Sequence, residues 1–124
     1  MSKMQRTKGA IGERELAELL RSIGIDAQRS ARNGVDQAED ILHGIPGVHI
    51  ECKRVERLNV SQAMRQATDA AGRKIPTVWH RRNREAWLVT MPAADVLIFA
   101  HSLIEASRAS REPLPFDEEP EAVP

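Results

Sequence analysis

The sequence has 124 residues, enough for one domain with a single hydrophobic core but too few for two. Its charges balance at 18 basic and 18 acidic residues, yet residues 1–84 hold 16 Lys and Arg against 10 Asp and Glu, whereas residues 85–124 hold 2 against 8. One cysteine excludes an internal disulfide framework, and from the polar, basic start we expect no signal peptide. The most apolar stretch, residues 93–104, is too short to cross a membrane. We therefore expect a cytoplasmic protein with a basic working surface, which suits a phosphate-rich partner.

Apolar spacing and turn residues predict the order helix, strand, strand, strand, helix, strand, strand, helix. The predicted elements are a helix at 8–23, strands at 25–29, 40–43 and 48–53, a helix from Asn59 or Ser61 to Gly72, strands at 75–80 and 86–90, and a helix at 93–108. This order is typical of an α/β domain with a small mixed β-sheet flanked by helices. The expected division is a flexible basic arm at 1–7, a folded domain at 8–109 and a disordered, acidic, proline-rich tail at 110–124.

The stretch from Asp40 to Lys53 combines reactive side chains with turn residues. It predicts a hairpin of two short strands joined by a tight turn at residues 44–47. Side chains alternate along a strand, so His49, Glu51 and Lys53 share one face of the second strand. With Asp40 arriving from the neighbouring strand, the two acids Asp40 and Glu51 together with Lys53 could hold a divalent cation and orient a water molecule. The alternative is an ordinary salt bridge between Glu51 and Lys53.

Glu13 breaks the amphipathic pattern of the first helix. It lies in register with Leu16, Ala17 and Leu20, on or beside the apolar stripe. A carboxylate there is costly unless it is paired, and the alternative is that Glu13 lies at the edge of the stripe and pairs with an arginine. Three converging carboxylates would need a cation, and hard oxygen ligands favour Mg²⁺ or Mn²⁺ over zinc.

The loop before Asp40 is polar and basic. It holds Arg29, Ser30, Arg32 and Asn33, and guanidinium, hydroxyl and backbone amide groups there suit contact with phosphate. Cys52 falls on the apolar face of its strand, so we expect it to be a small buried residue.

An acid on the first helix, then Asp, then Glu-x-Lys resembles the PD-(D/E)xK nuclease superfamily, whose core is restriction-endonuclease-like. Within it the chain resembles archaeal-type Holliday junction resolvases, over about residues 6–90. The residues that carry this resemblance are Lys8-Gly9, Glu13-Arg14-Glu15-Leu16, Gly24, Arg29-Ser30, Asp40-Ile41 and Glu51-Cys52-Lys53. One departure is Glu39, which stands where the superfamily has proline; it shapes a turn and supplies no ligand.

The resemblance implies that Asp40, Glu51 and the backbone carbonyl of Cys52 hold Mg²⁺, for which Mn²⁺ can substitute. Glu13 would bind a second ion or the water shell of the first, and Lys53 would orient or deprotonate the attacking water. Glu13, Asp40, Glu51 and Lys53 are thus the expected catalytic residues. The expected DNA contacts are Arg29, Ser30, Arg32, Arg54 and Gln66.

The resulting hypothesis is a metal-dependent DNA endonuclease that resolves four-way junctions as a homodimer, since paired cuts related by a twofold need paired sites. Two alternatives remain open: a phage- or mobile-element-type nuclease acting on linear or single-stranded DNA, and a non-catalytic DNA-binding protein of the same fold. The dimer interface could lie on the third helix or around Trp79 and Trp87, although core packing would explain both tryptophans.

Overall fold

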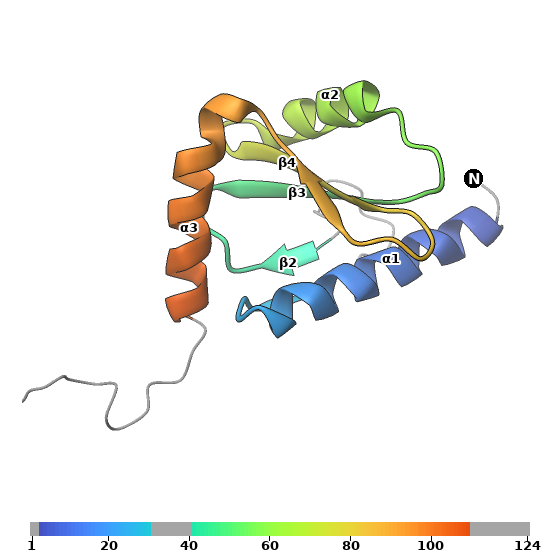
Figure 1. Cartoon of the computed structure of the whole chain (residues 1–124), viewed down its shortest axis with the longest axis horizontal. Helices are drawn as coiled ribbons and strands as arrows, with labels where there is room; N and C mark the ends of the chain where they lie inside the picture. The colour runs from blue at the N-terminus through green and yellow to red at the C-terminus, as the bar shows by residue number, and fades with distance from the viewer. Residues whose placement is uncertain (1–2, 31–40, 110–124) are drawn as a thin grey trace, which may run out of the picture.

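The computed structural model describes residues 3–30 and 41–109 (Figure 1). In chain order its elements are α1 (Lys3–Ser22), β1 (Ala27–Arg29), β2 (Ile41–His43), β3 (Val48–Arg54), α2 (Val60–Ala71), β4 (Ile75–Arg81), β5 (Leu88–Thr90), the 3₁₀ turn η1 (Ala93–Asp95) and α3 (Val96–Ala109). The order of helices and strands confirms the α/β class predicted from the sequence. Arg32, Asp40 and the predicted tail at 110–124 lie outside the described residues.

Helix α1 buries Leu16, Ala17 and Leu20, as its apolar spacing predicts. It begins at Lys3 rather than at residue 8, because the preceding residues contain good helix formers and no proline, so part of the expected arm is helical. The helix ends as predicted: Gly24 has a φ of 92°, and the amide of Ile25 donates to the carbonyl of Leu20 at 2.9 Å.

The strands form two sheets in the described part of the chain, one of β1 and β2 and one in the order β3-β4-β5. β1 runs antiparallel to β2, β3 parallel to β4, and β4 antiparallel to β5. The predicted turn at residues 44–47 is present, but β2 and β3 do not pair as the expected hairpin. The backbone shows why: the amide of Gly44 donates to Asp26, beside β1, whereas the carbonyl of Gly47 accepts from Ile75, the first residue of β4.

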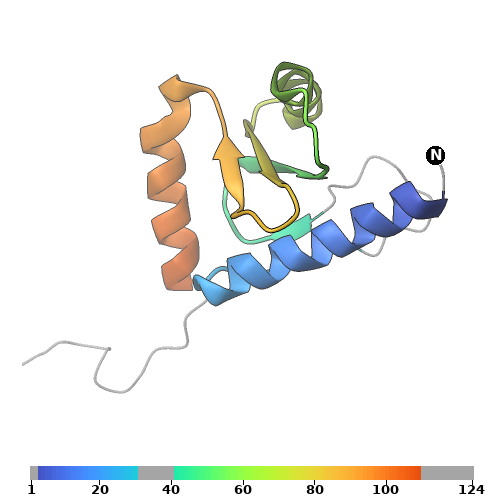
Figure 2. The ribbon, with the colours of Figure 1, turned by 45° about the vertical axis from the view of Figure 1, so that its right-hand side comes forward.

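Figures 1 and 2 show α1 and α2 on opposite sides of β3 and β4, with α3 standing across one end of the strands. The larger core joins α1 to the strands and includes Leu20, Ile41, Ile50 and Trp79. A smaller one places Ala63 and Ala67 of α2 against Val78. Asn59 caps α2 as predicted, its side chain accepting from the amide of Gln62 at 3.0 Å.

Helix α3 faces the core with a different stripe from the one that the sequence predicts. Phe99 and Ala106 are buried, and Phe99 packs on Trp79 with ring centroids 6.3 Å apart. The sequence spacing predicts a buried stripe of Val96, Leu97, Ala100, Leu103 and Ile104. Of these, Leu97 and Ile104 are instead 83% and 54% exposed. Residues 96–100 of the helix are all apolar, so the spacing there could not define the buried face, and the contact of Phe99 with Trp79 decides it. Among the described residues no helix is long and apolar enough to span a membrane.

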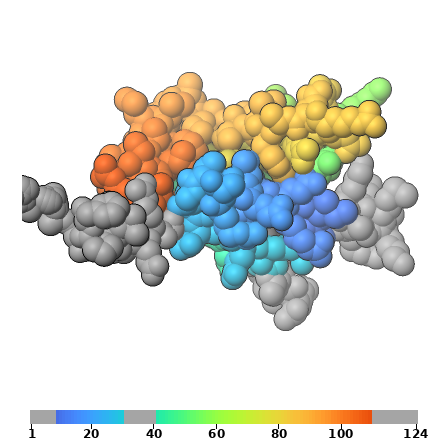
Figure 3. All heavy atoms as spheres, turned by 60° about the horizontal axis from the view of Figure 1, so that its bottom comes forward, coloured from blue at the N-terminus to red at the C-terminus, as the bar shows by residue number. Residues whose placement is uncertain are grey.

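Figure 3 shows that the C-terminal end of α1 borders α3, whereas the rest of α1 lies beside the connection between β4 and β5. Helix α1 therefore reaches both the small sheet that ends at Arg29 and the far end of the larger sheet. This position brings the two helical acids Glu13 and Glu15 to different strands.

Candidate active site and nucleic-acid contacts

The side chains of β3 alternate between an apolar face and a polar face that carries Glu51 and Lys53, as period-two alternation predicts. Val48 and Ile50 are each 1% exposed, and Cys52 packs half-buried against the same core. Glu51 therefore points to the opposite face. It pairs in register with Val78, which packs against α2. The Glu-x-Lys row thus lies on the α2 side of the sheet.

Glu51 is held by neighbours at both carboxylate oxygens. Its Oε2 lies 3.8 Å from Nζ of Lys53, and its Oε1 lies 3.1 Å from Nε2 of His49. The side chains of Glu51 and Lys53 are 20% and 28% exposed, whereas that of His49 is 8% exposed. The predicted grouping of Glu51 with Lys53 is confirmed. We did not predict a site role for His49, although alternation had already placed it on this face.

Glu13 is buried on α1 and makes an ion pair with β1. Its Oε1 accepts a hydrogen bond from Nε of Arg29 at 2.8 Å, and only 11% of its side chain is exposed. The pairing with an arginine, which the sequence left open, is therefore present. Arg29 keeps 42% of its side chain exposed, so it can still face a ligand beside this bond.

The expected DNA contacts differ in how they are placed. Ser30, at the end of β1, is 6% exposed, so most of its surface is covered. Gln66 is exposed on α2, the helix that packs on the same side of the sheet as Glu51. Arg32 lies outside the residues that the structure describes.

Arg54 is directed into the protein, contrary to its predicted role in binding DNA. Its Nε donates to Oε1 of Glu15 at 3.0 Å, Nη1 of Arg81 reaches the same oxygen at 3.0 Å, and the Arg54 side chain is only 12% exposed. Side chains alternate along β3, so Arg54 points to the face opposite that of Lys53, which is the face covered by α1. There α1 comes so close that a Cβ added to Gly12 would lie 2.5 Å from Cβ of Arg54.

The predicted metal ligands are described only in part. Glu13 and Glu51 are carboxylates in sheltered positions, whereas Asp40 precedes the first described residue of β2. Within residues 3–30 and 41–109, no three His, Cys, Asp or Glu side chains group closely enough to hold a metal ion. The oxygen donors present nevertheless match the chemistry that Mg²⁺ prefers.

Comparison with known proteins finds similar solved structures but no matching family model. No family model matches the chain, and no curated protein matches it. Among solved structures, the chain is similar to Hjc from Archaeoglobus fulgidus, described as a Holliday junction resolvase from an archaeal hyperthermophile. The two are 24% identical with a TM-score of 0.45, over 68% of this chain and 72% of that one.

Proposed function

We propose that the chain is a Mg²⁺-dependent endonuclease that hydrolyses phosphodiesters of branched DNA, four-way junctions in particular, as a symmetric dimer. The observation that carries this proposal is the pair of Glu51 and Lys53 on one face of β3, with Nζ and Oε2 3.8 Å apart. A carboxylate and an ammonium at this spacing leave room for a water molecule that contacts both. An isolated surface salt bridge needs no buried histidine on the second oxygen, whereas Glu51 has His49 there.

In this proposal each side chain has a separate task. Lys53 orients the attacking water and offsets negative charge that develops on the phosphate. His49 limits rotation of the Glu51 carboxylate, so that the second oxygen faces Lys53. Glu13 is held in place by the hydrogen bond that Arg29 donates to it in a site sheltered from water.

The metal would be held by Asp40, Glu51 and the backbone carbonyl of Cys52, with Glu13 near a second ion or its water shell. When bound, Mg²⁺ or Mn²⁺ lowers the pKa of a coordinated water and neutralises phosphate charge. The protein residues then bind the DNA and hold the water in line with the scissile bond.

Preference for branched DNA and the dimer follow from the resemblance in sequence motifs, and an exposed surface supports the dimer. Helix α3 leaves Leu97, Ile98 and Ile104 exposed by 83%, 61% and 54%, an apolar face that a second copy could cover. Trp79 is buried in the core and Trp87 packs against it, so the tryptophans do not supply this surface.

Cleavage of end-labelled DNA with Mg²⁺ tests the proposal. We expect the wild type to cut a four-way junction faster than nicked or linear duplex or single-stranded DNA, and Asp40→Asn, Glu51→Gln and Lys53→Ala to abolish cutting. Glu13→Gln should weaken it, whereas Glu18→Gln, an exposed acid on the same helix, should not. Faster cutting of linear or single-stranded DNA would favour a nuclease of the phage or mobile-element type. Binding of DNA without cleavage in Mg²⁺ or Mn²⁺ would favour the non-catalytic protein.

A further inference from the structure

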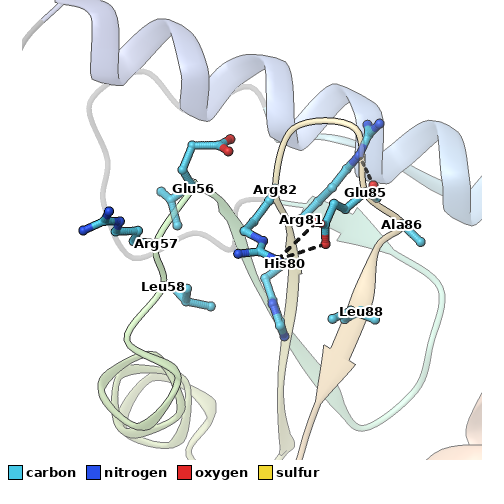
Figure 4. A pocket seen from close by; sticks show the side chains of 10 residues that line it. Glu56, Arg57, Leu58, His80, Arg81, Arg82, Glu85, Ala86 and Leu88 are labelled. Atoms are coloured by element: carbon cyan, nitrogen blue, oxygen red, sulfur yellow. Dashed lines mark hydrogen bonds and ion pairs between the residues drawn. The ribbon is translucent and has the colours of Figure 1, made fainter.

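A pocket of about 360 Å³ lies beyond the ends of β3 and β4, between the connection that leads to α2 and the turn that leads to β5 (Figure 4). We call it the flank pocket. Its lining includes Arg57, Leu58, His80, Arg82, Glu85 and Leu88. In Figure 4, Leu58 and Leu88 lie on either side of His80, while Arg57 lies beside Leu58 and Arg82 lies beside Glu85. The pocket therefore combines apolar with charged side chains in its lining.

The flank pocket continues the face that carries Glu51 and Lys53. Lys53 pairs in register with His80 across the parallel ladder, and paired residues on neighbouring strands point to the same face. His80 lines the pocket, so the pocket begins one strand away from Lys53. A DNA strand whose phosphate lies at Lys53 would pass this pocket with an adjoining nucleotide.

Charge in the pocket favours an anion, because each of its two glutamates already has partners. Oε2 of Glu85 lies 3.1 Å from Nη2 of Arg82, and Oε2 of Glu56 accepts from the amide of Asn83 at 2.9 Å. Glu56 also lies 3.8 Å from Nη1 of Arg54, which neutralises it from outside the pocket.

Two arginines in the lining are not equivalent. Arg81 is occupied, since it donates to Glu15 and to the carbonyl of Glu85. Arg57 is exposed and has no ion-pair partner among the residues that the structure describes. Arg57 is thus the arginine of this lining that is available to a ligand, whereas Arg82 is held by Glu85.

We propose that the flank pocket binds the nucleotide next to the cleaved phosphodiester, with Arg57 on its phosphate and Leu58 and Leu88 against its sugar. This inference rests on the proposed function. The volume exceeds what a phosphate alone fills and falls within the range of small-ligand pockets. Arginine suits the role because its planar fork binds phosphate through two N–H groups.

Fluorescence anisotropy with a fluorescein-labelled four-way junction in EDTA, titrated with NaCl, tests the phosphate contact apart from catalysis. Losing one phosphate contact lowers the slope of log K against log salt by about one unit, which is roughly tenfold in affinity per decade of salt. We expect this change in Arg57→Ala but not in Arg57→Lys. Arg73→Ala is the matched control, because Arg73 is an exposed arginine at the opposite end of β4. Glu85→Gln, which releases Arg82, should bind the junction several-fold more tightly.

The position of the contact is tested by replacing single phosphates of the cleaved strand with neutral methylphosphonates. We expect wild type to lose affinity at a phosphate adjoining the cut, and Arg57→Ala to be insensitive at that phosphate. Equal salt-dependence slopes for Arg57→Ala and Arg73→Ala would overturn the proposed nucleotide site in the flank pocket. So would an unchanged methylphosphonate interference pattern in Arg57→Ala. Neither result would contradict the proposed nuclease activity. Failure of the wild type to bind or cut any DNA would instead overturn the proposed function.

Discussion

His49 Nε2 lies 3.1 Å from Oε1 of Glu51, and the histidine side chain is almost fully buried at 8% exposure. Groups that orient a catalytic or metal-binding carboxylate in this way commonly contribute ten- to a hundredfold to affinity or activity. We expect His49→Leu to lower the rate of junction cleavage by about tenfold or more at saturating Mg²⁺.

His49→Gln keeps a hydrogen-bonding side chain and should recover part of the rate. His101→Leu is the control, because His101 is exposed on α3. Equal rates for His49→Leu and the wild type, with the variant folded by circular dichroism, would rule out a positioning role.

Glu15 joins three elements through one oxygen, which accepts from both Arg54 and Arg81 at 3.0 Å. Glu15→Ala leaves the sheltered guanidinium of Arg54 without its main partner, so we expect the free energy of unfolding to fall by about 2 kcal/mol. Urea denaturation measures this change. Glu18→Ala on the exposed side of α1 should stay within roughly 0.5 kcal/mol of wild type. A similar result for both variants would mean that the network adds nothing to stability.

Gly12 and Gly9 offer a matched pair on α1. A Cβ at Gly12 would lie 2.5 Å from Cβ of Arg54, whereas a Cβ at Gly9 meets nothing within 4 Å. Gly12→Ala forces the helix away from β3 and should destabilise the fold by about 1–3 kcal/mol. Gly9→Ala should stabilise it by roughly 0.5–1 kcal/mol, because alanine favours the helix. Thermal melting compares the two, and a stabilising Gly12→Ala would contradict the close approach of α1.

His80 links stability to pH. Desolvation by burial lowers the pKa of His80 below its ordinary value of 6.5. The unfolded chain therefore binds a proton at His80 more readily than the native chain does. The free energy of unfolding is therefore not reduced by His80 above about pH 6.5. It falls as pH drops from there through the lower pKa of His80 in the native chain.

We expect the melting temperature to fall between pH 7 and pH 5, and less so in His80→Gln, whose amide can still bond Thr90 as His80 does at 2.9 Å. His101→Gln, an exposed site, serves as the comparison. An identical pH profile for wild type and His80→Gln would show that His80 does not control this step.

The exposed apolar face of α3 predicts the dimer surface. Leu97→Glu places a charge where a second copy would pack, so we expect sedimentation to shift from dimer to monomer. The side chain is 83% exposed, and the stability of the monomer should therefore change little. Glu105→Lys, on an exposed position of the same helix, tests whether charge alone separates the copies. A dimer unaffected by Leu97→Glu would place the interface elsewhere.

Local patterns in the sequence predicted the elements and the reactive face of β3. Alternation with period two placed Glu51 and Lys53 together, and capping residues such as Asn59 and Gly24 marked helix ends. Alternation also assigns Arg54 to the opposite face, but its basic neighbours made it look like a DNA contact. The basic residues around Arg54 could not indicate its true partner, because Glu15, which pairs with Arg54, lies 39 residues away in the chain.

Other features depend on distant partners and could not be inferred locally. Phe99, not Leu97, faces the core because Trp79 lies opposite it. The pairing of β2 with β1 rather than β3 depends on backbone bonds from both ends of one turn, at Gly44 and Gly47. The roles of Asp40 and Arg32 remain predictions, as do the metal and the substrate.

The division of the strands at residues 44–47 has a consequence for metal affinity. In the described chain no ladder of backbone hydrogen bonds spans β2 and β3, the strands beside the predicted ligands Asp40 and Glu51. Their spacing is set instead by packing of Ile41, Ile45 and Val48 in the shared core. A change in side-chain volume at Ile45 can therefore alter the separation of β2 from β3, the strand of Glu51, while every strand keeps its partner. If Asp40 and Glu51 hold a metal ion as we propose, the volume of this core residue would tune ion affinity independently of the acids themselves.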